Sequence, residues 1–355
     1  MIAVLVGTRP ELIKIAPILR ILKKKKIKHI FIHSNQHYSF EMDKKILQDL
    51  NIREPDYNLN IGSSSHATQT GKIMEGVEKI CLKHSPKIIL VHGDTNTTLG
   101  GALAAKKLQI AVAHIEAGLR SFDLRMPEEI NRMIVDRISD ILFAPTVLAK
   151  KNLIREGISR KNIMVTGNTV VDALYEHISL SEKSTILERL NIQPSNYILA
   201  TAHRAENVDS SKQLKKIVAL LEHATQKLGK KIIYPIHPRT QQKIEEFGIT
   251  LSQNIIVIKP VGYIDMLQLQ THASLILTDS GGIQEEAFIL KKPLMTLRDS
   301  TERPETLTAN FIIHNSKTKF NEAWKAYQNG DASWNDSFGT GTASSTIVDR
   351  LLKVI

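Results

Sequence analysis

Three carboxylates of this sequence follow apolar runs or open a helical pattern, where they could act as acids or bases. Asp94 follows the run Lys87 to His92, and Glu116 follows the run Ile110 to Ile115. Glu128 comes directly after a proline that fits the first position of a helix. Carboxylates held in this way can remove and return protons. Taken alone, Asp94 could instead cap a helix, and Glu128 could complement a helix dipole.

Two cations, Arg9 and Lys14, stand where the first apolar run gives way to a helical pattern. The motif Gly7-Thr8-Arg9-Pro10-Glu11 puts its proline at the first helical position. The free amides and the dipole of a helix N-terminus favour anions, so these cations could contact a phosphate. The alternative is a turn with two solvated side chains. The motif is not the G-x-G-x-x-G of a dinucleotide site, so we expect no NAD.

The second half of the sequence has polar residues in similar places. His203 follows the run Tyr197 to Thr201, and a second histidine follows the next run. In the motif Thr278-Asp279-Ser280-Gly281-Gly282-Ile283-Gln284-Glu285-Glu286, two glycines let the backbone approach a diphosphate at a helix N-terminus. Glu286 lies on the same helical face and could accept hydrogen bonds from a ribose diol. The alternatives are a satisfied structural histidine and a glycine-rich turn with a solvated acid.

These residues need elements that bring strand ends together. Short runs rich in Ile and Val alternate with longer amphipathic segments, the pattern of βαβ units. The sequence therefore predicts an α/β fold with two Rossmann-like domains that face each other across a cleft. We expect the first domain at 1–168, the second at 169–343, and a terminal helix at 344–355 that packs back on the first. The expected strands are Ala3 to Val6, His29 to His33, Lys87 to His92, Ile110 to Ile115, Ile141 to Ala144, Ile163 to Thr166, Tyr197 to Thr201, Lys231 to Ile236, Ile255 to Ile258, Leu275 to Thr278 and Leu294 to Leu297.

The composition limits the class of protein. The 355 residues are 42% hydrophobic and 23% charged, which indicates folded domains rather than a disordered chain. The formal charge of +11 is scattered and no nucleic-acid-binding motif accompanies it, so we expect anionic substrates and no nucleic acid. No run is long enough to span a membrane and the first residues do not have a secretory pattern, so we expect a soluble protein that is not secreted. No H-E-x-x-H or C-x-x-C spacing predicts a metal site. With a single cysteine, Cys81, the sequence predicts a cytoplasmic protein.

Together the motifs make the chain resemble the non-hydrolysing UDP-N-acetylglucosamine 2-epimerases over nearly its whole length. The resemblance implies the two-domain glycosyltransferase-B fold, a homodimer, a UDP-sugar substrate, no cofactor, and a role in polysaccharide biosynthesis. The activity that it implies is the interconversion of UDP-N-acetylglucosamine and UDP-N-acetylmannosamine by elimination and re-addition of UDP. The matching segments are Gly7 to Glu11, Gly93 to Thr95, His114 to Arg120, Pro127 to Glu129, Asp279 to Glu286 and Arg298 to Glu305.

The resemblance also implies roles for single residues. The catalytic set that it implies is Asp94, Glu116, Glu128 and His203. The substrate-binding set that it implies is Arg9, Lys14, Asp94, Glu116, His203, Val261, Met266, Ser280, Gly281, Gly282, Glu286 and Arg303. Within that set Ser280 and the two glycines would hold the phosphates and Glu286 the ribose. The backbone of Val261 and the side chain of Met266 would lie at the uracil.

Other activities stay open at this point. A glycosyltransferase of the same fold, a nucleotide-sugar-binding regulator, a hydrolysing epimerase and an epimerase of a UDP-diacetamido-uronic acid all share parts of the pattern. The three carboxylates argue against the first two. The sequence departs from the family pattern at Phe338 to Gly341 and at Thr346, which bears on the packing of the last helix. It also departs at Gln36 to Ser39, which leaves open whether a second substrate molecule activates the protein.

Overall fold

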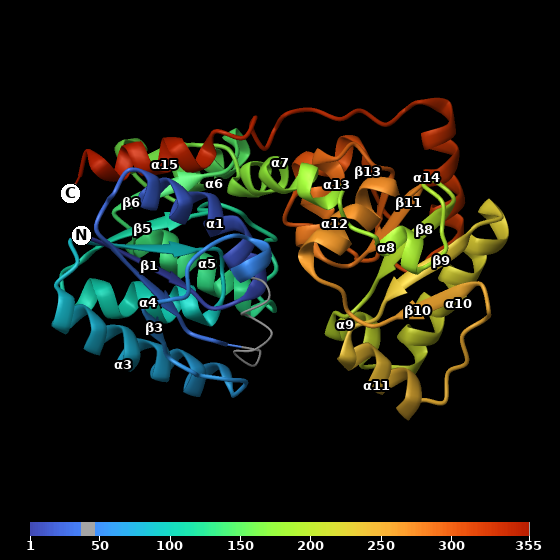
Figure 1. The fold of residues 1–355 in the computed structure, drawn as a ribbon, viewed down its shortest axis with the longest axis horizontal. Coiled ribbons are helices and arrows are strands. Elements are labelled where there is room, and N and C mark those ends of the chain that lie inside the picture. Colours follow the sequence, from blue (N-terminus) through green and yellow to red (C-terminus); the bar gives the residue numbers. More distant parts are fainter. Residues whose placement is uncertain (37–46, 355) are drawn as a thin grey trace. The chain divides into compact units, whose positions relative to one another are not determined.

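The computed structural model describes residues 1–36 and 47–354. They form two compact units, Met1–Glu176 with Ser337–Ile355, and His177–Asp336 (Figure 1). The sequence predicts the divisions after residues 168 and 343, whereas these units divide after Glu176 and after Asp336. The stretch 37–39, part of the departure from the family pattern noted above, lies outside the described residues, as does Ile355.

The first unit contains a seven-stranded parallel sheet in the order β3-β2-β1-β4-β5-β6-β7. Its central strands are short runs of Ile, Val, Leu and Ala that are buried along their whole length, as expected for a parallel sheet covered by helices. The strands are β1 (Ile2–Val6), β2 (His29–His33), β3 (Tyr57–Asn58), β4 (Ile88–His92), β5 (Ala111–Ile115), β6 (Ile141–Ala144) and β7 (Ile163–Val165). The helices are α1 (Arg9–Lys24), α3 (His66–His84), α4 (Asn96–Lys107), α5 (Pro127–Ile138), α6 (Val147–Arg155), the 3-10 helix η1 (Arg160–Asn162), α7 (Thr169–Ser181), which runs on into the second unit, and α15 (Ala343–Leu352).

The strand order of this sheet reverses between β1 and β4. Strands β2 and β3 lie on one side of β1, and β4 to β7 lie on the other. The loops after β1 and β4 therefore lead away in opposite directions from the carboxyl edge of the sheet, which is where doubly wound sheets bind ligands. The loop after β4 carries Asp94, and Arg9 begins α1 directly after the loop that follows β1.

The second unit contains a six-stranded parallel sheet in the order β10-β9-β8-β11-β12-β13. Its order reverses between β8 and β11, and the loops after these strands carry His203 and Ser280. The strands are β8 (Tyr197–Thr201), β9 (Lys231–Pro235), β10 (Ile255–Ile258), β11 (Leu275–Thr278), β12 (Leu294–Thr296) and β13 (Asn310–Ile312). The helices are α8 (Ile186–Arg189), α9 (Ala205–Val208), α10 (Ser211–Leu228), α11 (Pro238–Glu246), α12 (Tyr263–His272), α13 (Gly281–Ile289), the 3-10 helix η2 (Pro304–Thr308) and α14 (Lys317–Asn329).

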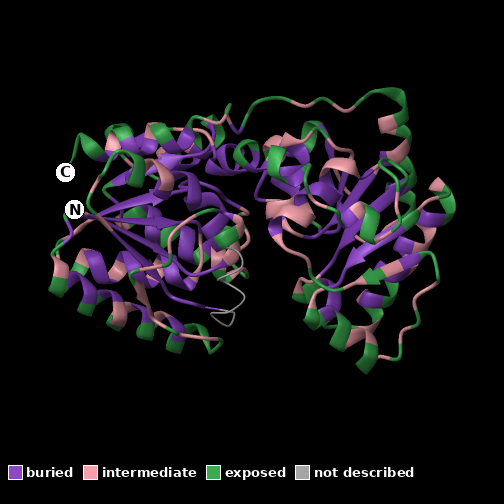
Figure 2. Ribbon diagram, in the orientation of Figure 1, coloured by how far each residue is buried: buried purple, intermediate pink, exposed green. Residues whose placement is uncertain are grey.

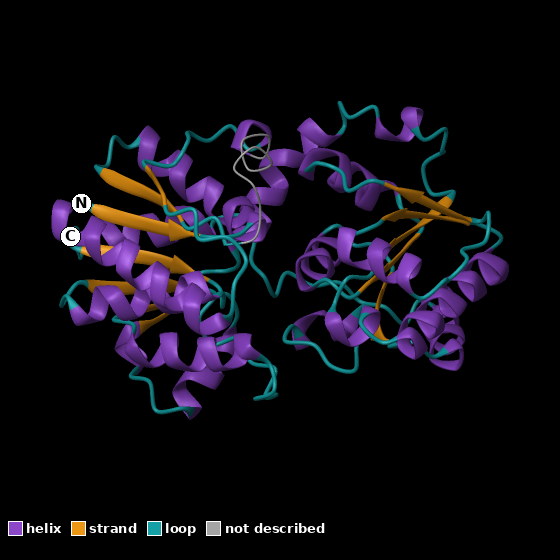
Figure 3. Ribbon diagram, turned by 90° about the horizontal axis from the view of Figure 1, so that it is seen from below, coloured by secondary structure: helices purple, strands orange, loops and turns teal. Residues whose placement is uncertain are grey.

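Burial follows this layering. The central strands are wholly buried and the edge strands only in part, while the helices alternate between buried and exposed faces (Figure 2). Helices cover both faces of each sheet (Figure 3). In the first unit Leu5 of β1 belongs to a cluster with Ile73 and Val77 of α3 and Ala102 of α4. Among the described residues, no helix has both the length and the apolar character needed to cross a bilayer.

The expected α/β fold with two Rossmann-like domains is confirmed, but two strands were not predicted. These are β3 and β13, which have only two and three residues. Each adds to the edge of its sheet, and so short a segment leaves no periodic pattern in a sequence.

The last helix is held to the first unit despite the unusual turn that precedes it. Phe338 is buried, and its carbonyl oxygen accepts the N–H of Asn168 at 2.7 Å. The Asp172 carboxylate of α7 accepts the N–H groups of Ala343 and Ser344 at the start of α15. These bonds satisfy a helix N-terminus that has no side-chain cap of its own.

Candidate functional site

The loop after β1 is fixed by the side chain of Glu11. Its Oε2 accepts the N–H of Gly7 at 2.5 Å and of Thr8 at 3.0 Å, and its Oε1 accepts the hydroxyl of Thr95 at 2.7 Å. Glu11 thereby ties the loop after β1 to the loop after β4. Gly7 must be glycine, because a Cβ there would overlap the side chains of Ser34 and Thr97. The backbone next to Arg9 is therefore held in one conformation.

Burial raises the pKa of Glu11 to about 7, and nearby Asp94 adds to the rise, against the three hydrogen bonds that favour the carboxylate. Protonation therefore favours the folded state. The resulting stabilisation is present in full below the unfolded value of 4.5 and is lost as the pH rises to 7. Across that window we expect the unfolding free energy of the wild type to fall by about 3 kcal/mol relative to Glu11→Gln.

Urea unfolding of both proteins between pH 4 and 8 measures this difference. Gln can accept both backbone N–H groups with its oxygen and donate to Thr95 with its nitrogen, so the variant keeps the loop without the titration. Stability curves of the two proteins that run parallel over this pH range would contradict the assignment.

Glu116 is buried and forms an ion pair with Lys14 of α1. Its own φ of +68° is left-handed, which is uncommon for a residue with a side chain, and Gly118 follows with φ +84°. Strained backbone of this kind persists where the surroundings impose it and occurs often at functional sites. Lys14, which the resemblance implied at the substrate, is placed by the structure against this carboxylate.

Buried polar groups hold the turn after β5 through hydrogen bonds and ion pairs. Asp136 of α5 accepts the N–H of Gly118 at 3.0 Å and forms an ion pair with Arg120 at 2.7 Å. His114 lies between Asp136, at 2.8 Å from Nδ1, and the carbonyl oxygen of Gly93, at 2.7 Å from Nε2. The backbone that carries Glu116 is thus connected to the loop that carries Asp94.

Asp94 is oriented by Arg132, which donates to its Oδ2 from Nε at 2.9 Å and from Nη2 at 2.7 Å. Arg132 also pairs with buried Glu129 at 2.6 Å. Asp94 does not cap the following helix, because Thr95 does so by accepting the N–H of Thr98. About a quarter of the Asp94 side chain stays exposed, so this carboxylate is both held and accessible.

Glu128 differs from its neighbour Glu129. Glu129 is buried and accepts the N–H groups of Ser121 and Phe122, so its role is structural. Glu128 is half-buried on the first turn of α5, and within the described part of the chain it enters no such network. Of the two acids after Pro127, Glu128 is therefore the accessible one.

In the second unit, His203 is oriented by a buried carboxylate. Its Nδ1 lies 3.1 Å from Asp279 Oδ1, and the N–H groups of His203 and Arg204 donate to Asp279 Oδ2 at 2.9 Å. Burial alone would raise the pKa of Asp279, but the hydrogen bonds from His203, Arg204 and Asn207 hold it below its usual value. The ring of His203 is partly exposed and lies 5.4 Å from that of His237.

The N-terminus of α13 has the features of an anion site. Ser280 caps it by accepting the N–H of Ile283, and Gly281 and Gly282 form its first turn. Arg303 lies against this turn, since a Cβ on Gly281 would come within 3.3 Å of its guanidinium carbon. Arg303 is itself held by Glu285 at 2.8 Å. Helix amides and a fixed arginine together suit a diphosphate.

Further along α13, Glu286 Oε2 accepts the side-chain amide of Gln270 at 2.6 Å. Val261 and Met266 are partly buried and pack against one apolar cluster with Ile283 of α13. Glu286, implied for the ribose, and Met266, implied for the uracil, thus lie on two helices that contact each other, α13 and α12.

Several of these groups had no role assigned from the sequence alone. Glu11 stands three positions after Thr8, a capping-box spacing that could have indicated its contact with the loop. Asp279 lay inside a noted motif, but nothing local shows that its partner is His203. Arg132 had no signal of its own, because its partner Asp94 comes from a distant segment.

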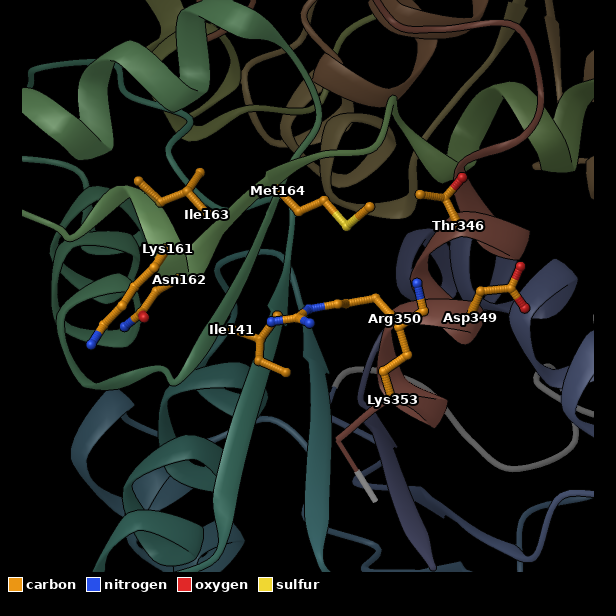
Figure 4. A pocket seen from close by; sticks show the side chains of 9 residues that line it. All are labelled: Ile141, Lys161, Asn162, Ile163, Met164, Thr346, Asp349, Arg350 and Lys353. Atoms are coloured by element: carbon orange, nitrogen blue, oxygen red, sulfur yellow. The ribbon is translucent and has the colours of Figure 1, made fainter.

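A solvent-open hollow of about 440 Å³ lies elsewhere on the first unit (Figure 4). It is lined by the residues that begin β6 and β7 and by side chains of α15, among them Arg350. It therefore lies at the amino ends of the strands, opposite to the edge that carries Asp94 and Glu116. Within the described residues, no group of three or more His, Cys, Asp or Glu side chains could hold a metal ion.

Comparisons with family models, with other sequences and with solved structures all match nucleotide-sugar 2-epimerases. A family model for UDP-N-acetylglucosamine 2-epimerase matches residues 20–352. A UDP-N-acetylglucosamine 2-epimerase of Methanocaldococcus jannaschii is 48% identical to this chain, and the match covers 98% of this chain and 97% of the relative. A crystal structure of that organism's UDP-GlcNAc 2-epimerase in complex with UDP-GlcNAc and UDP is similar with a TM-score of 0.93, covering 99% of both chains. A UDP-2,3-diacetamido-2,3-dideoxy-D-glucuronate 2-epimerase of Pseudomonas aeruginosa is 40% identical over 99% of both chains.

Proposed function

The chain belongs to the UDP-N-acetylglucosamine 2-epimerase family, and from that premise we propose that it interconverts UDP-N-acetylglucosamine and UDP-N-acetylmannosamine without hydrolysis. It is accordingly an isomerase. The observation that carries the proposal is the pair of carboxylates Asp94 and Glu116, which follow adjacent strands and are each held by a cation.

The chemistry explains why such groups are required. The hydrogen at carbon 2 of the sugar is not next to a carbonyl, so a base can remove it only as the diphosphate leaves carbon 1. The electrons of the C–H bond form the double bond of a 2-acetamidoglucal, and UDP departs with those of the C–O bond. Protonation of the other face and return of UDP give the epimer. Carboxylates serve the proton steps, and donors at the diphosphate stabilise its charge as it leaves.

The residues divide between these two tasks. We assign the proton steps to Asp94, Glu116 and Glu128, with His203, which Asp279 orients, as a further acid–base group. We assign the diphosphate to the N-terminus of α13 with Arg303, and in the first unit to Arg9. Glu286 accepts hydrogen bonds from the ribose hydroxyls, and Val261 and Met266 lie at the uracil. No step requires a hydride acceptor, so we expect no cofactor.

Turnover in deuterated water tests the route. The product must acquire solvent deuterium at carbon 2, because a removed proton is replaced from an acid that exchanges with solvent. Oxygen label in the bridge between sugar and diphosphate should also scramble into non-bridging positions, since the freed phosphate can rotate. Proton and phosphorus NMR read both signals. Epimerisation that kept the original hydrogen, or that required added NAD, would contradict this mechanism.

A second candidate substrate is a UDP-diacetamido-uronic acid, which the 40% identity to the Pseudomonas aeruginosa enzyme favours. Its sugar carries a carboxylate at carbon 5 and a second acetamido group at carbon 3. Comparison of kcat/KM for the two UDP-sugars decides between them. We expect the larger value with UDP-N-acetylglucosamine, because the identity to the Methanocaldococcus jannaschii enzyme is higher.

Glu286→Ala should weaken UDP binding by roughly 1 to 3 kcal/mol, because a charged acceptor is lost from the ribose. The loss should be much smaller for a UDP analogue that lacks both ribose hydroxyls. Isothermal titration calorimetry with the two ligands measures this. The variant Glu246→Ala, on exposed α11, serves as the control and should bind like the wild type. Equal losses of affinity for both ligands would show that Glu286 does not contact the diol.

We further propose a homodimer, which helix α5 supports. Its buried face is polar, with Glu129, Arg132 and Asp136, whereas its exposed face carries Ile130 and Ile134. This reverses the usual arrangement of a surface helix, and exposed apolar faces commonly mark interfaces. A second copy of the chain would cover it.

Sedimentation of the wild type should give a dimer, and Ile134→Glu should give a monomer, because a buried charge opposes association. The exposed α3 variant Glu75→Gln is the control and should sediment as the wild type. A wild type that sediments as a monomer at micromolar concentration would exclude the proposal.

We place the protein in the cytoplasm, where its one buried thiol, Cys81, stays reduced. We place its product in polysaccharide biosynthesis.

A further inference from the structure

His92, the last residue of β4, is a buried histidine whose ring is left unsatisfied. Its exposed fraction is 2%, and neither ring nitrogen has a hydrogen-bond partner among the described residues. Burying a polar group without a partner costs free energy, so a structural histidine normally has its nitrogens satisfied. His114 of the adjacent strand β5, the residue before the partner of His92, follows that rule with Asp136 and the Gly93 carbonyl. The ring nitrogens of His92 do not follow this rule, which indicates that the ring has a role other than packing.

The Glu116 carboxylate lies beside this ring. His92 Nε2 lies 4.0 Å from Glu116 Oε1, the same oxygen that receives the Lys14 ammonium. Burial lowers the pKa of His92 to about 4, with Lys14 and His114 lowering it further and Glu116 and Asp94 opposing. Near neutral pH the ring is therefore an uncharged imidazole, with one nitrogen able to accept a hydrogen bond.

Glu116 must change protonation during the reaction proposed above. When the carboxylate holds the proton taken from carbon 2, it loses its charge and with it the attraction of Lys14. The new O–H then needs an acceptor. Nε2 of His92 can provide one after an approach of about 1 Å, which would bring the two atoms to ordinary hydrogen-bond distance.

We propose that His92 is a positioning residue that accepts a hydrogen bond from Glu116 whenever Glu116 is protonated, so that Lys14 holds the charged form and His92 the neutral form. The inference rests on the proposed epimerase function, because only an acid–base role makes Glu116 pass through both forms. The proposed role of His92 is the same whether Glu116 removes the proton from one face of the sugar or delivers a proton to the other. In both cases Glu116 is protonated for part of each catalytic cycle. The proton remains on Glu116 and is not transferred to the ring.

A matched pair of variants tests this. His92→Gln keeps an amide group that can accept near the position of Nε2, whereas His92→Met has a similar length and only a weak thioether acceptor. We expect His92→Met to lower kcat by about 10- to 100-fold, with KM and UDP affinity within about twofold of the wild type. His92→Gln should recover a large part of that loss.

The pH profile gives a second readout that packing alone would not change. An acceptor that favours protonated Glu116 raises the pKa of that carboxyl, so its removal must lower it. The limb of the kcat profile that reports Glu116 should therefore move to lower pH in His92→Met and return toward the wild type in His92→Gln. Thermal melting should show both variants folded, since the methionine replaces unsatisfied polar atoms with an apolar group of similar size.

The outcomes separate this inference from the function on which it rests. If the wild type shows no solvent exchange at carbon 2, the epimerase proposal fails and this one fails with it. If the wild type exchanges and His92→Met has the same kcat and the same pH profile, only the role of His92 is wrong. A loss of kcat that His92→Gln does not recover at all, with unmoved pH limbs, would likewise assign His92 to packing.

Discussion

Asp94→Asn should reduce turnover by about 100-fold or more while UDP still binds with nearly unchanged affinity. The variant has the same shape, keeps an oxygen for Arg132, and removes only a charge that an acid–base step requires. Glu116→Gln should behave in the same way, because its amide oxygen can still receive Lys14. The groups assigned above to the diphosphate, the N-terminus of α13 with Arg303 and Arg9, are unchanged in both variants, so UDP binding should not follow the loss.

Initial rates and calorimetry with UDP on the same preparations separate chemistry from binding. Glu75→Gln, which changes an exposed carboxylate of α3 paired with Lys79, is the matched control and should keep wild-type rates. Near-normal turnover in both Asp94→Asn and Glu116→Gln would exclude the assigned site. A parallel loss of UDP affinity and kcat would instead point to a folding defect, which thermal melting would detect.

Arg132→Met should destabilise the first unit by about 3 to 5 kcal/mol and also abolish most turnover. The guanidinium is buried and pairs with both Asp94 and Glu129, so its loss leaves Glu129 charged, buried and unpaired. Arg137→Met, at an exposed position of the same helix, should change stability by no more than about 0.5 kcal/mol. Urea unfolding of the two variants measures the difference.

Adding Glu129→Gln to Arg132→Met distinguishes the two effects of the arginine. The oxygen of the introduced amide could still accept one of the two backbone N–H groups that Glu129 receives from Ser121 and Phe122, and no buried charge would remain, so part of the stability should return. Turnover should not return, because Asp94 still lacks the group that orients it. Recovery of both properties together would mean that Arg132 acts only through stability.

Much of the fold could be predicted because each element leaves a local signal. Strands β2 and β8 have the predicted limits, since a buried parallel strand is a short apolar run with a turn at each end. Doubly wound topology follows from the alternation of such runs with helices. The edge strands β3 and β13 escaped prediction because they are too short to form a run.

The candidate site could be predicted in part for the same reason. Glu116 stands directly after its strand, and Asp94 and His203 each come one residue later. Parallel strands bring such positions to the carboxyl edge of their own sheet. Glu128 and Glu129 look alike in sequence, and only the packing of α5 shows that one is buried with Arg132 while the other stays partly exposed.

The sequence by itself therefore determined which residues follow the strands, the two Rossmann-like domains, and the family to which the motifs belong. The tertiary structure alone decided the partners: Lys14 with Glu116, Arg132 with Asp94, Asp279 with His203, and His92 beside Glu116. The physical reason is that a strand or a turn is specified by neighbours in the chain. An ion pair between distant segments depends on the order in which crossover connections place the strands, and on which side chains that order removes from water.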